Sequence, residues 1–220
     1  MQTIVKELTG SADAAVIWLH GLGADGNDFV DVLKYLNLTK DQNIRFIFPS
    51  APMRRVTINN GLQMRSWYDI KAMLPARVID EKELDQSIFD VNELIAEQIA
   101  QGIAANRIIL VGFSQGGAVA YETALTSKLD IAGVAAMSTY LPRLLTKDQC
   151  HLRAAASVLS IHGEQDDVVL CELGKNSVKH LESLGYEPKL HTFAMSHEVS
   201  LQSLTVLGQW LTSVLNNAES

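Results

Sequence analysis

The chain has 220 residues, of which 47% are hydrophobic and 20% charged, and its net charge at pH 7 is −7. A chain of this length can bury one sizeable core, so we expect a single domain over residues 1–220. The acidic balance, without any cluster of lysine or arginine, argues against nucleic acid or an anionic membrane surface as the main partner.

The sequence also shows no pattern of a signal peptide, a membrane span or a set of disulfides. The N-terminal residues lack a basic segment followed by an apolar stretch and a small-residue cleavage site, so we do not expect secretion through a signal peptide. No run approaches 18 consecutive apolar residues, which predicts that nothing spans a bilayer. Cys150 and Cys171 are too few for a disulfide framework and lack metal-ligand spacing. Together these features predict a cytoplasmic protein with reduced thiols.

Short apolar runs rich in β-branched residues alternate with longer segments of helical period along the chain. This alternation is typical of an α/β fold, with a mostly parallel central sheet and helices on both faces. In chain order we expect strand 14–20, helix 27–36, strand 44–48, helix 81–102, strand 107–113, helix 115–127, strands 131–137 and 156–162, helix 171–185, strand 188–193 and helix 197–215. Residues 49–80 are the exception, because they are too long for a connector and rich in proline, methionine and aromatic residues.

The segment RIILVGFSQGGAVAYETAL (107–125) reads as a strand, a sharp turn and a helix, with the pattern G-x-S-x-G at the turn. In this context the central serine sits in a strained backbone conformation that exposes its hydroxyl above the sheet, and the glycines let strand and helix approach. The pattern therefore predicts Ser114 as a nucleophile. The alternative, a glycine-rich turn that only packs tightly, does not explain the serine.

A serine nucleophile needs a general base, usually histidine, that is oriented by a carboxylate. His197 follows the last expected strand across a short loop and is expected to open the final helix, at the same edge of the sheet as Ser114. Of the remaining histidines, His20 and His162 end expected strands in His-Gly pairs, where a histidine more often braces a turn. His180 lies in an expected helix, His151 in a polar connector and His191 inside an expected strand.

The carboxylate is expected in the loop after strand 156–162, where SIHGEQDDVV places two aspartates side by side. Only one of two adjacent side chains can lie against the imidazole of His197. The chain order of serine, aspartate and histidine is the order found in α/β-hydrolases. The residues alone leave Asp166 and Asp167 open as the acid.

Two backbone amides are expected to stabilise the oxyanion of the reaction. One belongs to Gln115, directly after the nucleophile, and the other to Leu22 in the glycine-rich loop WLHGLGADGNDF (18–29). The same loop matches the dinucleotide-binding pattern G-x-G-x-x-G, which is the alternative interpretation. That site would need an acidic residue after the next strand, and the chain has PSAP (49–52) there.

Six segments in chain order resemble the phospholipase/carboxylesterase family of small α/β-hydrolases, which includes the acyl-protein thioesterases. They are HGLGADGNDF (20–29), FPSAP (48–52), SWYD (66–69), GFSQGG (112–117), HGEQDDVV (162–169) and MSHEV (195–199). The resemblance implies an α/β-hydrolase fold and a serine carboxylesterase acting on short- to medium-chain acyl esters. Acyl-protein thioesterase or lysophospholipase activity is the alternative, and a non-catalytic acyl-binding protein is a remote one.

Carried over residue by residue, the resemblance supports Ser114, Asp166 and His197 as a catalytic triad, and the same two oxyanion amides. The family signature His-Gly-x-x-Asp selects the first of the two aspartates. Leu170 stands where the family usually has proline, which predicts a less rigid acid loop. The implied mechanism needs no metal and no organic cofactor.

The segment 49–80 looks like the acyl-binding loop of the family. Met64, Trp67, Met73 and Leu74 are the candidates for an apolar groove, and the alternative is that they cap the core. Expected partners are a small acyl ester, a lipid or an acylated protein, and no nucleic acid. Exposed apolar loops are also typical of transient membrane contact or of a homodimer, and both alternatives stay open.

Overall fold

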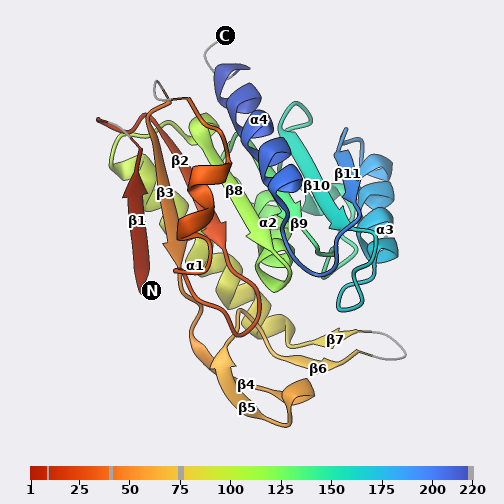
Figure 1. Cartoon of the computed structure of the whole chain (residues 1–220). Helices are drawn as coiled ribbons and strands as arrows, with labels where there is room; N and C mark the ends of the chain where they lie inside the picture. The colour runs from red at the N-terminus through yellow and green to blue at the C-terminus, as the bar shows by residue number, and fades with distance from the viewer. Residues whose placement is uncertain (9, 40–41, 74–76, 218–220) are drawn as a thin grey trace.

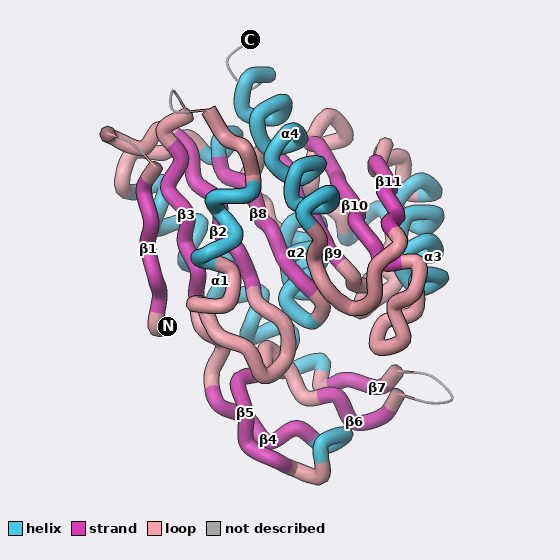
Figure 2. Tube along the Cα trace, in the orientation of Figure 1, coloured by secondary structure: helices cyan, strands magenta, loops and turns pink. Residues whose placement is uncertain are grey.

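The computed structural model describes residues 1–8, 10–39, 42–73 and 77–217. Within these residues a seven-stranded sheet has the order β1-β3-β2-β8-β9-β10-β11, with β1 antiparallel to β3 and all other neighbours parallel (Figures 1 and 2). The strands are β1 Thr3–Glu7, β2 Ala14–Leu19, β3 Ile44–Pro49, β8 Ile108–Phe113, β9 Gly133–Met137, β10 Ser157–Gly163 and β11 Lys189–Phe193. The expected α/β architecture is therefore confirmed.

Strand β1 was not expected from the sequence, because this edge strand is largely exposed and carries no apolar run. The helices are α1 Glu81–Ala100, α2 Gln115–Thr126, α3 Cys171–Ser183 and α4 Leu201–Asn217, with 3-10 turns η1 Val30–Tyr35, η2 Thr57–Asn59, η3 Ala105–Arg107 and η4 Lys147–Gln149. The expectation of an α-helix over 27–36 was wrong, because η1 is a 3-10 turn. None of the helices within the described ranges is long and apolar enough to cross a membrane.

The final helix also begins later than expected. The hydroxyl oxygen of Ser200 accepts a hydrogen bond from the Ser203 amide at 3.2 Å, which caps the first turn of a helix that starts at Leu201. His197 therefore lies in the loop before α4 and does not open the helix. Because His197 lies in a loop, a helical backbone does not fix the direction of its side chain, and the imidazole can point toward the sheet edge.

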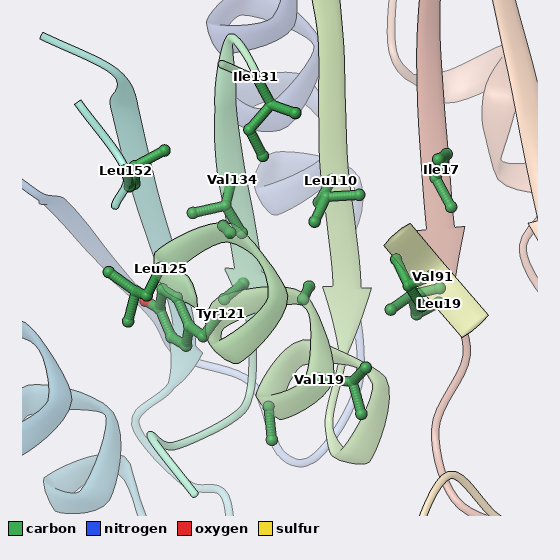
Figure 3. Packing of buried hydrophobic residues seen from close by; sticks show 14 of the residues in the cluster. Ile17, Leu19, Val91, Leu110, Val119, Tyr121, Leu125, Ile131, Val134 and Leu152 are labelled. Carbon is green, nitrogen blue, oxygen red and sulfur yellow. The ribbon is translucent and has the colours of Figure 1, made fainter. Parts of the chain in front are cut away.

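Both faces of the sheet are covered, which explains why its central strands read as continuous apolar runs. Alternate residues of β2 belong to two separate clusters: Ile17 and Leu19 pack with α1 and α2, whereas Val16 and Trp18 pack with η1 and α4. Figure 3 shows the first cluster between the sheet and the helices α1 and α2. Such two-sided burial fixes the sheet rigidly, and the carboxyl ends of its parallel strands meet at one edge.

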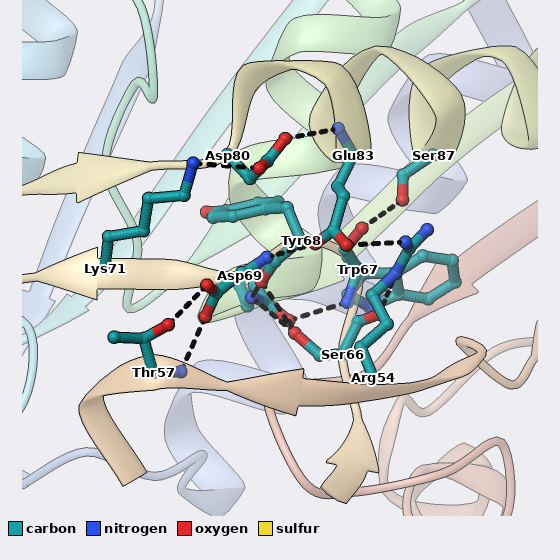
Figure 4. Close-up of polar contacts among 11 residues, drawn as sticks. Arg54, Thr57, Ser66, Trp67, Tyr68, Asp69, Lys71, Asp80, Glu83 and Ser87 are labelled. Carbon is teal, nitrogen blue, oxygen red and sulfur yellow. Dashed lines mark hydrogen bonds and ion pairs between the residues drawn. The ribbon is translucent and has the colours of Figure 1, made fainter. Parts of the chain in front are cut away.

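The segment 49–80 is more regular than the sequence suggested. It contains two antiparallel hairpins beyond the carboxyl ends of the central strands (Figure 1), formed by β4 Met53–Val56 with β5 Leu62–Arg65 and by β6 Ile70–Ala72 with β7 Val78–Ile79. Polar contacts join them: Asp69 accepts from the amide and hydroxyl of Thr57, and its own amide donates to Glu83 of α1 (Figure 4). The hairpins are thus attached to the first long helix.

An ion pair between a buried glutamate and a half-buried arginine joins α2 to the loop after β9. The Glu122 side chain is fully buried, its Oε1 lies 2.6 Å from Nε of Arg143, and its Oε2 has no hydrogen-bond partner among the described residues. Burial raises the pKa of the Glu122 carboxyl, and the Arg143 guanidinium opposes this shift. Stability linked to a raised carboxyl pKa is present at low pH and decreases as the pH rises through the folded-state pKa.

We therefore expect Arg143→Met to lower the free energy of unfolding at neutral pH by about 3 kcal/mol, because it leaves the buried carboxylate without its cation. The loss should shrink as the pH falls below about 4.3, because the carboxyl then becomes protonated in the unfolded state as well as in the folded state. Urea denaturation across this pH range measures the effect. Arg153→Met is the control, because Arg153 pairs with Asp130 on the surface and should cost less than about 1 kcal/mol. An equal loss for Arg143→Met at both ends of the range would contradict this account.

Candidate active site

Ser114 lies at the sharp turn between β8 and α2, with a φ of 53° and a ψ of −120°. This backbone conformation is strained for a residue with a side chain, and neighbouring glycines make it sterically accessible. A Cβ at Gly112 would lie 2.3 Å from the carbonyl oxygen of Gly116, and a Cβ at Gly116 would lie 2.4 Å from the carbonyl oxygens of Leu19 and His20. The expected close approach of strand and helix is confirmed.

The structure brings Ser114, His197 and Asp166 into one hydrogen-bonded chain. Nε2 of His197 lies 2.9 Å from Oγ of Ser114, and Nδ1 of His197 lies 2.7 Å from Oδ2 of Asp166. Since a carboxylate only accepts, Nδ1 carries the proton and Nε2 is free to accept the serine proton. The Asp166 side chain is buried, whereas Asp167 is exposed. This geometry can generate a serine alkoxide at the carboxyl edge of the sheet.

The acid loop is fixed by the aspartate itself. Oδ1 of Asp166 accepts hydrogen bonds from the amides of Val168 at 3.0 Å and Val169 at 2.7 Å. Leu170 has a φ of −51°, close to the value that a proline ring imposes, and it directly precedes α3. The leucine at this position therefore adopts a proline-like backbone, and the expectation of a less rigid loop is not supported by these contacts.

Leu22 and Gln115 both line a cavity together with Ser114. Nδ1 of His20 lies 2.7 Å from the carbonyl oxygen of Gly21 and donates to it, because Nε2 of the same ring accepts from the Ala51 amide at 2.9 Å. In a trans peptide the N–H points away from the C=O, so the Leu22 amide is directed opposite to this bond. Among the described residues it has no hydrogen-bond partner. It is therefore available to an oxyanion.

His20 thus braces a turn, as its position in a His-Gly pair suggested. Burial lowers the pKa of His20, which keeps the ring neutral and its two nitrogens in their separate roles. The loop also contacts the hairpin segment: the Gly23 amide donates to the carbonyl of Arg65, and the Gly26 amide donates to the hydroxyl of Ser50. These amides are engaged within the protein, which speaks against the dinucleotide interpretation.

The side chain of Gln115 has a role that the sequence did not reveal. Its Oε1 accepts from the Trp67 amide at 2.9 Å, and its Nε2 donates to the carbonyl of Tyr68 at 2.6 Å and to the hydroxyl of Ser66 at 3.1 Å. The indole N–H of Trp67 donates to the carbonyl of His20 at 2.8 Å. The segment SWY (66–68) is therefore fixed to both loops that carry the candidate oxyanion amides.

The cavity has a volume of about 480 Å³, and its lining is mostly apolar. Apart from Ser114, His197 and the two oxyanion residues, it is lined by side chains from distant parts of the chain, namely Phe29, Val32, Ile58, Ile70, Met73, Phe113, Tyr140, Val168, Val169 and Val199, with Asp28, Arg77 and Glu198 as charged members. A mostly apolar cavity that Ser114, Leu22 and Gln115 also line has the size and character to hold an acyl chain.

The structure places the three described candidates for the groove in different surroundings. Met73 lines the cavity, whereas Leu74 lies outside the described residues. Met64 does not line the cavity, and its sulfur accepts a hydrogen bond from the side-chain amide of Asn59. The prediction was wrong for Trp67, which has no exposed surface and whose carbonyl accepts from the hydroxyl of Ser87 (Figure 4). A buried indole needs a partner for its N–H, and this requirement was the available signal for a structural role.

Comparison with known proteins identifies the family of the chain. Residues 2–215 match the model of the family described as Phospholipase/Carboxylesterase. Acyl-protein thioesterase 1 homolog 1 from Dictyostelium discoideum is 35% identical over 216 residues, covering 96% of this chain and 95% of the relative. Acyl-protein thioesterase 1 from Cryptococcus neoformans is 35% identical over 222 residues, with 92% of each protein covered.

A solved structure extends the comparison to the fold. The crystal structure of Zea mays acyl-protein thioesterase 2 has a TM-score of 0.87 and 26% sequence identity, and the match covers 97% of this chain and 99% of that one. The expected resemblance is thus confirmed by sequence over nearly the whole chain and by structure. The chain belongs to the phospholipase/carboxylesterase family and is a serine hydrolase with the α/β-hydrolase fold.

Proposed function

We propose that this chain hydrolyses acyl esters and thioesters through a covalent acyl-enzyme on Ser114. The proposal rests on one observation: the hydrogen-bonded chain from Asp166 through His197 to Ser114 ends in an apolar cavity. A serine hydroxyl becomes a nucleophile when a neutral imidazole accepts its proton, and a buried carboxylate stabilises the resulting imidazolium. The cavity supplies the space in which an acyl carbonyl reaches the nucleophile.

In the proposed reaction, Oγ of Ser114 attacks the acyl carbonyl while its proton moves to Nε2 of His197. The amides of Leu22 and Gln115 donate hydrogen bonds to the oxyanion of the tetrahedral intermediate. The intermediate collapses when the bond from the carbonyl carbon to the leaving oxygen or sulfur breaks, and the imidazolium returns its proton to that atom. Water then repeats the sequence on the acyl-serine, which releases the carboxylic acid and restores the free hydroxyl.

We infer that the natural substrate is an acylated protein or lipid, with acyl-cysteine thioesters as the favoured class. Two relatives that align over more than nine-tenths of this chain are named acyl-protein thioesterases. The chemistry itself accepts oxygen esters as well, because both substrate classes pass through the same tetrahedral intermediate. Small carboxylic esters of short to medium chain length are therefore expected as alternative substrates.

The substrate class can be measured directly with p-nitrophenyl esters and acyl-thioesters of graded chain length. We expect turnover of both series and a higher kcat/KM for thioesters at matched chain length. A lysophospholipid should be included in the series. A higher kcat/KM for the lysophospholipid than for every thioester would move the assignment to a lysophospholipase.

Replacement of the nucleophile gives the first test of the mechanism. We expect Ser114→Ala to lower kcat by at least about 10³-fold, because no other hydroxyl occupies its place beside His197. A fluorophosphonate should label the wild-type protein at Ser114 and leave the variant unlabelled, as read by mass spectrometry. Ser196→Ala is the control, because this exposed serine lies in the same loop as His197 and should keep both properties. Labelling of Ser114→Ala at another serine would overturn the assignment.

The two aspartates of the acid loop give the second test. Asp166→Asn should lower kcat by about 10⁴-fold, because an amide neither stabilises the imidazolium nor holds the required tautomer. Asp167→Asn should stay within about twofold of the wild type, because the side chain is exposed and its amide replacement has the same size. Steady-state kinetics on one ester measure both. Equal losses, or a larger loss for Asp167→Asn, would contradict the proposed acid.

A further inference from the structure

His162 is a second histidine beside the carboxylate of Asp166. It lies in β10, one residue before the strand ends, and only 1% of its surface is exposed. Its Nε2 lies 2.7 Å from the carbonyl oxygen of Val169 and 3.5 Å from Oδ2 of Asp166. Since Oδ2 also accepts from Nδ1 of His197, this oxygen lies between two imidazole rings. The 3.5 Å contact between Nε2 of His162 and Oδ2 of Asp166 is electrostatic rather than a strong hydrogen bond.

The contacts determine the protonation of His162. A carbonyl oxygen only accepts, so Nε2 must carry a hydrogen, and Nδ1 has no hydrogen-bond partner among the described residues. Burying an unprotonated Nδ1 without a partner costs less free energy than burying an Nδ1–H donor that has no acceptor. Burial also lowers the pKa of His162, although the negative charge of Asp166 opposes the shift. The ring is therefore a neutral donor that presents its N–H edge to the acid loop.

Helix α3 holds the ring in this place. A Cβ at Gly174 would lie 2.3 Å from Nδ1 of His162, so the glycine lets α3 approach the imidazole directly. On its other side the ring holds the carbonyl of Val169, and the amide of the same residue donates to Oδ1 of Asp166 at 2.7 Å. Val169 thus accepts a hydrogen bond from His162 through its C=O and donates one to Asp166 through its N–H.

We propose that His162 is a positioning residue for the triad acid, on which it acts through the backbone of Val169 and through the N–H edge that faces Oδ2. This inference rests on the proposed function, because it assigns Asp166 to the orientation of His197. Removal of the donor frees the backbone of Val169 to move, and the carboxylate then loses one of the two amides that hold its Oδ1. The expected consequence is a poorer stabilisation of the imidazolium with no change in the cavity that binds the acyl chain.

The test compares His162→Gln with His162→Asn, because the glutamine amide nitrogen reaches the position of Nε2 and the asparagine nitrogen does not. We expect His162→Asn to lower kcat by about 10- to 100-fold with KM within about twofold, which is the usual effect of removing a supporting hydrogen bond. His162→Gln should restore most of the lost kcat. Both rates are divided by the fraction of protein that is folded, as measured by circular dichroism.

A double-mutant cycle separates positioning from general stability. In the Asp166→Asn background, His162→Asn should change kcat by less than about twofold, because the group through which it acts is already lost. His180 supplies the matched control, since its Nε2 holds the carbonyl of Leu145 at 2.9 Å and touches no member of the triad. His180→Asn should leave kcat unchanged in both backgrounds.

Equal kcat for the glutamine and asparagine variants, or the same factor of loss in both backgrounds, would overturn the role of His162. The proposed function has a separate readout in the same experiment, the labelling of wild-type Ser114 by a fluorophosphonate. Absence of that label would contradict the proposed function and with it the assignment of the acid. Labelling together with additive losses would overturn the inference about His162 alone.

Discussion

The close contact between the β8–α2 turn and the end of β2 is the constraint on which the rest of the site depends. Gly112 and Gly116 leave no space for a Cβ, so the backbone of the turn packs directly on the carbonyls of Leu19 and His20. This contact holds Ser114 at a positive φ that an isolated chain would avoid. It also places the amide of Gln115 beside the loop that follows β2. The candidate nucleophile and the candidate oxyanion donors are thus positioned by backbone packing within a rigid sheet.

Uncharged side chains then hold the loops around this turn. His20 holds the peptide between Gly21 and Leu22, His162 holds the Val169 carbonyl, and Gln115 holds three groups of the segment 66–68. A neutral donor or acceptor fixes a loop without placing a second full charge near the buried carboxylate of Asp166. Burial lowers the pKa of both histidines, which keeps them in this state.

The segment 49–80 connects the substrate cavity to the core. Its two hairpins lie beyond the sheet edge, and Trp67 anchors them by a fully buried indole that donates to the carbonyl of His20. Ile70 and Met73 from the same segment line the cavity. Because Trp67 is hydrogen-bonded to the Gln115 side chain and to the carbonyl of His20, the nearby residues of the cavity wall are held close to Ser114.

The sequence by itself determined the α/β alternation, the nucleophile turn and the chain order of the triad candidates, because these depend on local periodicity, on glycine spacing and on which residue follows a strand. It did not determine where α4 starts, since the serine that caps this helix does not stand out in the apolar pattern. It also did not predict strand β1, since this exposed edge strand has only a weak apolar pattern. Only the tertiary structure decided which side chains line the cavity. Phe29, Tyr140 and Val199 come from three distant segments that meet at the sheet edge, whereas Trp67 turns inward. The packing of helices against the sheet determines which side chains become neighbours in the cavity. The pattern of residues along the chain does not contain this information.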